Sequence, residues 1–366
     1  MAKIPLGRPE MTDEMIEAAA SALRNERLVM GESVKKFEEE FARFTGTKHA
    51  ISCSSGTNAL QLAMIAAKVG GKEVLTTPFS FIATANAVIE AGAKPTFADS
   101  SERDYNIDSI KVVKAIRDTT AGILPVHLYG NPTDMDPLVE VCRKKRLLLV
   151  EDACQAHGAV YKGKRAGSIG DVGCFSFYPT KNMTVGGDGG MITTNDDKLV
   201  KEIAKLRDCG RVSRYIHDVV GYTSRLNTCN AAIGRVQLRN LERYNERRRD
   251  LAKLYSHELK GLEQVVIPSM GDKDVTPVFH LYVIRCKQRD ELAKHMEAKG
   301  IEVGVHYPVP IHLQPIYQQM YGYKEGDFPV SEALSNQLMS LPIFPALKES
   351  EVKEVCGAIK EFYWGK

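Results

Sequence analysis

The sequence predicts an α/β protein: a large domain whose mostly parallel central sheet is flanked by helices, followed by a smaller C-terminal α+β domain. Between residues 49 and 206, short apolar runs alternate with longer segments whose apolar residues recur at helical spacing. This alternation is typical of parallel sheets that are covered by helices on both faces. After a long helical segment, strands and helices follow in the order of a separate unit. We therefore place the large domain at residues 1–245 and the small domain at residues 246–366.

The elements of the large domain follow one another in a regular order. Apolar residues at helical spacing, among them Phe37, Phe41 and Phe44, predict that the chain opens with helices. Strands are expected over residues 49–52, 73–77, 95–98, 122–128, 147–151, 172–178 and 191–194. Helices are expected over residues 13–24, 33–44, 58–68, 83–91, 109–116, 137–145 and 197–206. A long helix over about 230–259 leads to strands over 265–268 and 277–286 and helices over 289–299 and 349–364.

The composition excludes several classes of protein. The 366 residues include 49 basic and 46 acidic ones, and a net charge of +3 gives no reason to expect a nucleic-acid or membrane partner. The basic run over residues 243–249 is interpreted as the solvated face of a helix. No apolar run approaches the ~20 residues of a membrane helix, and no secretory signal is visible. The eight cysteines form no C-x-x-C pair, which favours reduced thiols in a cytoplasmic protein without a metal site.

Two chemically distinctive residues follow the ends of two expected strands. Asp152 comes directly after the strand over 147–151, and Lys181 comes shortly after the strand over 172–178. Ligands of α/β folds bind at the ends of such strands, so we expect the carboxylate and the amine to lie near one ligand. A glycine cluster at Gly186, Gly187, Gly189 and Gly190 lets the backbone approach that ligand closely.

Several neighbours of these residues allow two interpretations. Asp152 suits the N-cap of a helix as well as a ligand contact. Gln155 either donates a hydrogen bond to the ligand or is a polar residue of a surface turn. Ser176 alternates with Phe175 and Phe177, so its hydroxyl faces away from both rings. That hydroxyl binds either a phosphate or a neighbouring strand or helix.

A second anion-binding element precedes a helix. The turn over residues 54–57 (SSGT) lies between a strand and a helix, where free N–H groups and the helix dipole attract anions. Its alternative interpretation is a serine-rich helix cap. The chain contains no P-loop motif, and its glycine cluster does not match the G-x-G-x-x-G of a dinucleotide site. Phe81, after another strand end, either stacks on a flat ring or packs in the core.

Pyridoxal 5'-phosphate (PLP) is the cofactor that this combination suits. PLP needs a carboxylate against its ring nitrogen, donors around its phosphate and an amine to hold its aldehyde. Asp152, the turn over 54–57 and Lys181 meet these needs in turn. The amine of Lys181 must be neutral to attack an aldehyde, and burial beside a cationic ring lowers its pKa accordingly.

The chain resembles the DegT/StrS-type aminotransferases, PLP enzymes of fold type I that aminate sugars. The resemblance runs over nearly the whole chain, from the segment PLGRP (5–9) to the final helix. Its motifs are SSGTNAL (54–60), PFSFIATANAV (78–88), EDACQAHGA (151–159), GDVGCFSFYPTKN (170–182), GDGG (187–190), SRLNTCNAA (224–232), HYPVPIHLQPIY (306–317) and MSLPIFP (339–345).

The resemblance implies roles for individual residues. Lys181 matches the catalytic lysine that holds PLP as a Schiff base, the internal aldimine, and Asp152 matches the partner of the pyridinium nitrogen. Gln155 matches the residue that contacts the phenolic oxygen of the ring, and Phe81 matches the aromatic residue stacked on it. The positions that match phosphate contacts are Gly56, Thr57 and Ser176, with Asn58 beside them where the family usually has a small residue.

One position departs from the family pattern. The family commonly has G-x-N-x-R where this chain has GYTSR (221–225), and that asparagine usually reaches the phosphate in the neighbouring subunit. Thr223 is shorter, so the cross-subunit contact is expected to be weaker, water-mediated or supplied elsewhere. The same family feature implies a homodimer with shared active sites.

The leading hypothesis is a PLP-dependent aminotransferase that moves an amino group from L-glutamate to a keto sugar linked to a nucleotide. The GDGG form of the loop resembles family members that aminate 3-keto sugars. Candidate substrate contacts are Arg225, His306 and Tyr307, each of which also suits an interface ion pair or a packing position.

Two alternatives differ in their chemistry. A PLP-dependent sugar dehydratase has the same fold, but in that branch the lysine position resembles histidine, and this chain has Lys181. A PLP-binding regulator without turnover would be expected to carry a DNA-binding unit, and no helix-turn-helix segment is visible.

Overall fold

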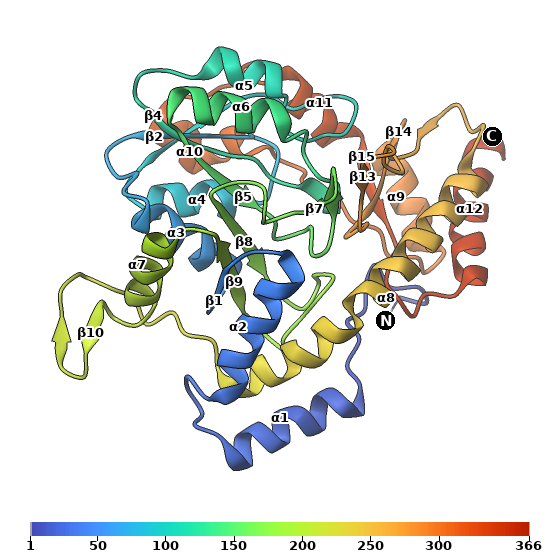
Figure 1. The fold of residues 1–366 in the computed structure, drawn as a ribbon. Helices are drawn as coiled ribbons and strands as arrows, with labels where there is room; N and C mark the ends of the chain where they lie inside the picture. Colours follow the sequence, from blue (N-terminus) through green and yellow to red (C-terminus); the bar gives the residue numbers. More distant parts are fainter. Residues whose placement is uncertain (1, 366) are drawn as a thin grey trace.

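A seven-stranded sheet forms the centre of the computed structural model, which describes residues 2–365 (Figure 1). The strands lie in the order β1 (His49–Cys53), β9 (Gly190–Thr194), β8 (Val172–Ser176), β5 (Leu148–Asp152), β4 (Thr120–Leu124), β2 (Glu73–Thr76) and β3 (Lys94–Phe97). All neighbours pair in parallel from β8 to β3, whereas β9 is antiparallel to both β1 and β8. The predicted α/β class with a mostly parallel sheet is confirmed.

Helices cover both faces of this sheet because its strands are apolar on both sides. One face packs against α3 (Gly56–Ala66), α4 (Ala83–Glu90) and α7 (Asp197–Arg207). The other face packs against α2 (Glu32–Thr45), α5 (Ser109–Ala115), α6 (Asp136–Lys145) and the first half of α8 (Thr228–Leu259). The helix α1 (Asp13–Asn25) lies along α8 (Figure 1).

A second, smaller sheet has its own hydrophobic core. Its antiparallel strands are β12 (Val265–Val266), β14 (Tyr282–Cys286) and β15 (Leu338–Leu341). They pack with α9 (Arg289–Ala298), α12 (Glu349–Trp364) and the second half of α8, and Ile4 from the start of the chain joins this core. The boundary predicted between residues 245 and 246 falls inside α8, and the division into two domains stays a prediction.

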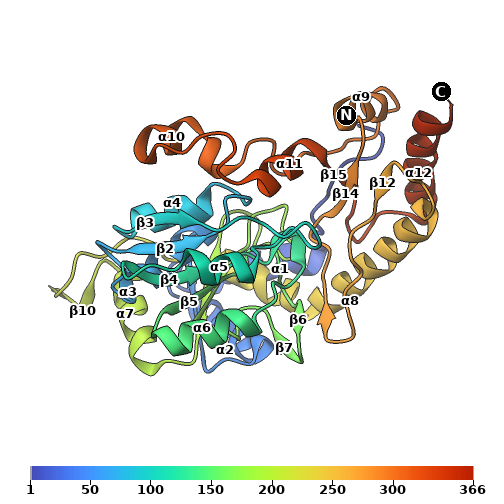
Figure 2. The same ribbon diagram turned by 90° about the horizontal axis from the view of Figure 1, so that it is seen from above.

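The structure contains elements that the sequence did not predict. The helices α10 (Pro315–Tyr321) and α11 (Pro329–Gln337) follow the 3-10 turn η2 (Ile311–Leu313), and Figure 2 shows α10 above α4 and β3. Ile311 and Tyr317 pack there with Ala85 and Phe97. Short ribbons pair β6 (Val160–Tyr161) with β7 (Lys164–Arg165) and β13 (Val275–Thr276). A hairpin of β10 (Arg211–Ser213) and β11 (Ile216–His217) projects from the body in Figure 1.

Two predicted strands are shorter than expected because the chain turns. The strand expected over 122–128 ends at Leu124, and the 3-10 turn η1 (Leu128–Gly130) follows, with Tyr129 at a φ of 57°. The strand expected over 277–286 begins only at Tyr282, because Phe279 has a φ of 45°. A strand cannot continue through such left-handed backbone.

One residue of the basic run over 243–249 corrects the prediction of a solvated face. Arg248 is buried, and its Nη1 donates to the carbonyl oxygens of Phe279 at 3.2 Å and Ile343 at 2.9 Å. It thereby joins α8 to two segments of the C-terminal part of the chain. Within residues 2–365, no helix combines the length and apolar character that crossing a membrane requires.

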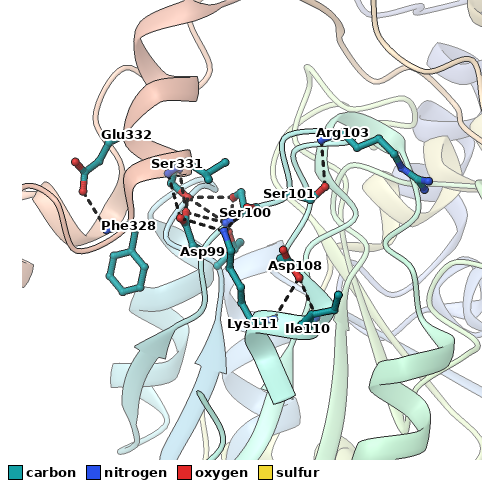
Figure 3. Close-up of polar contacts among 12 residues, drawn as sticks. Asp99, Ser100, Ser101, Arg103, Asp108, Ile110, Lys111, Phe328, Ser331 and Glu332 are labelled. Atoms are coloured by element: carbon teal, nitrogen blue, oxygen red, sulfur yellow. Dashed lines mark hydrogen bonds and ion pairs between the residues drawn. The ribbon is translucent and has the colours of Figure 1, made fainter. Parts of the chain in front are cut away.

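The end of β3 is joined to α11 by a buried carboxylate (Figure 3). Oδ1 of Asp99 accepts hydrogen bonds from the N–H of Ser331 at 2.9 Å and from its hydroxyl at 2.7 Å, and Oδ2 accepts from the N–H of Val330 at 3.0 Å. Burial opposes ionisation, but the hydrogen bonds from Ser331 and Val330 prevail and hold the pKa of Asp99 below its ordinary value. Asp99 therefore caps α11 and fixes it over the large sheet.

We expect Asp99→Ala to lower the free energy of unfolding at neutral pH by about 2 kcal/mol, because it leaves the buried donors of α11 unpaired. Since the pKa of Asp99 is lower in the folded state, its contribution is present above the unfolded pKa and is lost as the pH falls through the folded one. The difference from the unmodified protein, measured by urea unfolding at a series of pH values, should therefore shrink in acid. The exposed Asp118 provides the control, and an equal effect of Asp118→Ala would contradict the capping role.

Candidate active site

A cavity of about 660 Å³ lies between the sheet, α8, the segment over residues 6–10 and three segments of the C-terminal part of the chain. Most of the predicted site residues line it: Gly56, Thr57, Phe81, Asp152, Gln155, Ser176, Lys181, His306 and Tyr307. These residues come from strand ends and loops that are far apart in the sequence. The structure therefore gathers at one place the groups that the sequence analysis selected one by one.

Asp152 is the last residue of β5, and its side chain belongs to the cavity wall. The residue is only 4% exposed. Its Oδ2 accepts a hydrogen bond from the hydroxyl of Thr84 at 2.8 Å, and its Oδ1 accepts from the N–H of Cys154 at 3.2 Å. No helix follows directly after β5, so the interpretation of Asp152 as a helix N-cap is wrong. Instead, one carboxylate oxygen accepts a hydrogen bond within the turn that follows β5, and the other accepts one from Thr84 of α4.

Lys181 lies in the turn that follows β8, and its side chain is half-buried in the cavity wall. Burial lowers the pKa of Lys181 below its ordinary value, although the nearby Cys154 and Asp152 act in the opposite direction. A lowered pKa increases the fraction of neutral amine, the form that attacks an aldehyde. The direction of this shift agrees with the prediction that burial lowers the pKa of Lys181.

The start of α3 forms a narrow cradle beside β8. The side chain of Ser55 is the N-cap, accepting from the N–H of Asn58 at 3.1 Å, so the cap interpretation holds for this serine. The N–H groups of the first turn have no partner within a helix, and those of Gly56 and Thr57 belong to cavity residues. A Cβ at Gly56 would lie 2.6 Å from the Cβ of Ser176, so glycine is required for this close approach.

Two aromatic rings form part of the cavity wall. Phe81 is 54% exposed, so the interpretation of it as a core residue is wrong. Its ring centroid lies 6.0 Å from that of Tyr307. Ser176 also lines the cavity, while the neighbouring rings of Phe175 and Phe177 are fully buried on the other face of the sheet, as the alternation predicts.

Gln155 is held in one orientation at the cavity wall. Its Oε1 accepts from the N–H of Tyr129 at 2.8 Å, and its Nε2 lies 3.4 Å from the hydroxyl of Tyr307. The side chain is buried, so the alternative of a polar residue in a surface turn is wrong. One N–H of its amide therefore donates to Tyr307, and the other remains for a ligand in the cavity.

Three predicted site residues lie outside this cavity. Oδ1 of Asn58 accepts from the hydroxyl of Ser54 at 2.5 Å, and the side chain faces its own helix. Thr223 is exposed, and its backbone forms an isolated antiparallel β-bridge with Asp208 at the base of the β10–β11 hairpin. Arg225 forms an ion pair with the same Asp208. Within the described chain, none of these three contributes to the cavity wall.

Sequence reasoning missed several residues of the site. Thr84, which holds Asp152, lies in the quoted motif PFSFIATANAV but was not singled out. Tyr244, Arg248 and His280 also line the cavity, and each carries a buried polar atom without a hydrogen-bond partner among the described residues. Burial lowers the pKa of His280 well below its ordinary value, so its ring is neutral. No local pattern marks these residues, because α8 reaches the cavity only through the tertiary fold.

The residues of the cavity fit PLP. Asp152 offers a buried carboxylate to a ring nitrogen, the cradle at Gly56 offers N–H groups to a phosphate, and Lys181 offers an aldehyde an amine whose pKa is lowered by burial. Phe81 offers an exposed ring face to a flat cofactor. A mostly parallel α/β fold with this site defines the class of PLP-dependent enzymes of fold type I.

Comparisons with known proteins make the assignment more specific. The family model described as the DegT/DnrJ/EryC1/StrS aminotransferase family matches residues 9–360. A "Pleiotropic regulatory protein" of Geobacillus stearothermophilus is 42% identical, over 97% of this chain and 95% of that protein. The dTDP-3-amino-3,4,6-trideoxy-alpha-D-glucose transaminase of Streptomyces venezuelae is 40% identical, over 96% of this chain and 93% of that enzyme.

A solved structure supports the same conclusion. The crystal structure of S. venezuelae DesV, in complex with a ketimine intermediate, superposes with a TM-score of 0.96 at 39% sequence identity and covers 99% of both chains. This chain belongs to the DegT/DnrJ/EryC1/StrS aminotransferase family. It is a PLP-dependent aminotransferase, so the predicted family, enzyme class and cofactor are confirmed.

The buried environment of Lys181 predicts a pH dependence of cofactor attachment. Because its pKa is lowered, the neutral amine should persist to lower pH than that of a free lysine. The rate at which PLP binds covalently to the cofactor-free protein should therefore reach half its maximum below pH 10.5, the ordinary pKa, and fall at more acid pH. Absorbance of the bound cofactor after mixing measures this rate.

Two variants provide the controls for this measurement. Lys181→Ala should abolish covalent attachment, whereas Lys164→Ala, at an exposed position, should not alter the pH profile. A midpoint at or above the ordinary pKa, or undiminished attachment in Lys181→Ala, would contradict the assignment.

Proposed function

We propose that this enzyme transfers an amino group from L-glutamate to a keto sugar that is linked to a nucleotide. The observation that carries the proposal is the joint placement of Lys181, Asp152 and the turn at Gly56 around one cavity. The S. venezuelae relative is named as a transaminase of a dTDP-linked sugar, and this similarity supports the same substrate class here.

Each polar group of the cavity has a task in this proposal. When bound, PLP supplies an electron sink for the carbon that gains or loses the amino group. Lys181 binds the cofactor covalently through Nζ and afterwards moves a proton to or from the reacting carbon as a general base. Asp152 balances the positive charge on the ring nitrogen, and Thr84 keeps its carboxylate in place. Gln155 donates from Nε2 toward the phenolic oxygen of the ring.

The substrate-binding residues His306 and Tyr307 form part of the cavity wall. Burial lowers the pKa of His306 to about 4, so at neutral pH this ring binds substrate as a neutral group. The GDGG loop supports a 3-keto sugar, and the S. venezuelae relative is named for a 3-amino sugar. We therefore favour amination at the third carbon of the sugar.

The proposed activity makes a spectroscopic prediction. L-glutamate should bleach the absorbance band of the bound cofactor and release 2-oxoglutarate in equal amount. In the reverse direction, a panel of dTDP- and UDP-linked amino sugars with 2-oxoglutarate should yield glutamate only with sugars aminated at the third carbon. A bound cofactor that no member of the panel alters would contradict a sugar substrate, and turnover of a 4-amino sugar would correct the position.

We further propose that the enzyme is a homodimer whose active sites are shared. Thr223 and Arg225 lie outside the cavity of their own chain, at the base of the projecting β10–β11 hairpin. The hairpin and the residues directly after it expose large apolar side chains, including Tyr215, Ile216 and Val220, whose burial against a second copy would be favourable. In such a dimer Thr223 approaches the cofactor phosphate of the partner subunit.

We expect a charge on this hairpin to separate the subunits. The unmodified protein should sediment with twice the mass of one chain, and Ile216→Asp should shift it toward the monomer and lower PLP retention on dialysis. Ile110→Asp is the matched control, because Ile110 is at least as exposed as Ile216 but lies on α5. Dimers of unchanged stability in Ile216→Asp would contradict the role of the hairpin.

A further inference from the structure

Tyr129 has a backbone conformation that residues other than glycine rarely adopt. Its φ is 57° and its ψ is 12°, in the left-handed region, and Gly130 follows with a φ of 88°. The residue is buried and does not line the cavity. Such conformations cost free energy and persist where the surrounding contacts require them. The contacts of Tyr129 therefore indicate what this conformation achieves.

The first contact decides which way the amide of Gln155 points. The left-handed turn directs the N–H of Tyr129 to Oε1 of Gln155 at 2.8 Å. A backbone N–H can only donate, and Oε1 is the only good acceptor of the amide. Nε2 must therefore face the other way, where the hydroxyl of Tyr307 lies 3.4 Å away.

The second contact reaches the same wall from the side chain. The hydroxyl of Tyr129 donates to the carbonyl oxygen of His306, the residue next to Tyr307. Burial raises the pKa of Tyr129 well above its ordinary value, so the phenol keeps the proton that it donates. These contacts form a closed hydrogen-bond network between the loops of the large sheet and the C-terminal part of the chain. Its members are Tyr129, Gln155, His306 and Tyr307.

We propose that Tyr129 is a positioning residue for both sides of the active site. Its backbone N–H orients Gln155 toward the cofactor. Its hydroxyl fixes the position of His306 and Tyr307, the substrate-binding part of the cavity wall, relative to Gln155. The inference rests on the proposed function, which assigns Gln155 to the cofactor and His306 and Tyr307 to the substrate. We call the contact of the backbone N–H with Gln155 the backbone arm, and the contact of the hydroxyl with His306 the hydroxyl arm. Because the two arms use different atoms, substitutions can test them separately.

The hydroxyl arm is tested by Tyr129→Phe, which keeps the ring and the backbone N–H. With the PLP-loaded protein and L-glutamate, the half-saturating glutamate concentration should rise about tenfold, as expected for the loss of one buried hydrogen bond. The absorbance spectrum of the bound cofactor should stay unchanged, because Gln155 keeps its backbone donor.

Tyr255→Phe is the matched control for this arm. Tyr255 is also buried and also donates from its hydroxyl to a carbonyl oxygen, that of Pro342 at 2.9 Å, but neither Tyr255 nor Pro342 lines the cavity. The Tyr255→Phe variant should have a lower melting temperature but an unaltered half-saturating glutamate concentration. If Tyr129→Phe lowers only the melting temperature, as the control does, the hydroxyl has no positioning role and the proposal is overturned for this arm.

The backbone arm is tested by a pair of variants that both lack the phenol. Asparagine tolerates the left-handed region, whereas a β-branched residue such as valine does not. Without any substrate, Tyr129→Asn should keep the pH midpoint of the bound-PLP absorbance, and Tyr129→Val should shift it and speed PLP loss on dialysis. Identical midpoints in the two variants would overturn this arm.

The two measurements also separate this inference from the proposed function. The absorbance of bound PLP requires neither glutamate nor a sugar, so the backbone test remains valid if another donor or acceptor proves to be the substrate. If Tyr129→Val does not fold, the hydroxyl test still decides whether Tyr129 positions the wall. Failure of glutamate to bleach the unmodified protein would instead count against the proposed donor.

Discussion

The carboxyl end of β5 depends on one buried carboxylate, that of Glu151, and the active site is built on this strand end. Glu151 and His127 are both fully buried, and Oε2 of Glu151 lies 2.9 Å from Nε2 of His127. The N–H of Thr133 donates to Nδ1 of His127 at 3.0 Å, so the proton of the ring is on Nε2 and points to the carboxylate. Three backbone N–H groups, those of Gly167, Ile169 and Gly170, complete its partners. A buried charge is tolerated only with such a full set of donors.

This constraint positions the next residue and the neighbouring turn. The N–H of Asp152 donates to the carbonyl oxygen of Pro125, and its own carbonyl oxygen accepts from the N–H of His127. The carboxylate of Asp152 therefore enters the cavity from a strand end that cannot shift. The turn at Tyr129 begins directly after His127, so the same anchor also places the residue that orients Gln155. The same few hydrogen bonds therefore stabilise this part of the fold and position the residues of the active site.

The electrostatics of the cavity follow from burial more than from ion pairs. Burial, and then the charge of Lys181, lowers the pKa of His306 to about 4 and that of His157 to about 3, so both rings are neutral near the amine. Neutral rings add no further positive charge beside Lys181, whose own pKa burial lowers. An amine whose pKa is lowered and a buried carboxylate are what a PLP enzyme needs from its protein.

Residue types and their spacing were enough to predict the α/β order, most helices and the placement of Asp152 and Lys181 at one cavity, because strand periodicity and strand-end chemistry are local properties of the sequence. The tertiary structure alone decided that Tyr129 turns left-handed, that Arg248 is buried, that α10 packs on α4 and β3 and that Thr84 holds Asp152. Each of these depends on contacts between segments far apart in the chain. A hydrogen bond such as that from Tyr129 to His306 leaves no periodic trace in the sequence, since its two partners meet only when the fold closes.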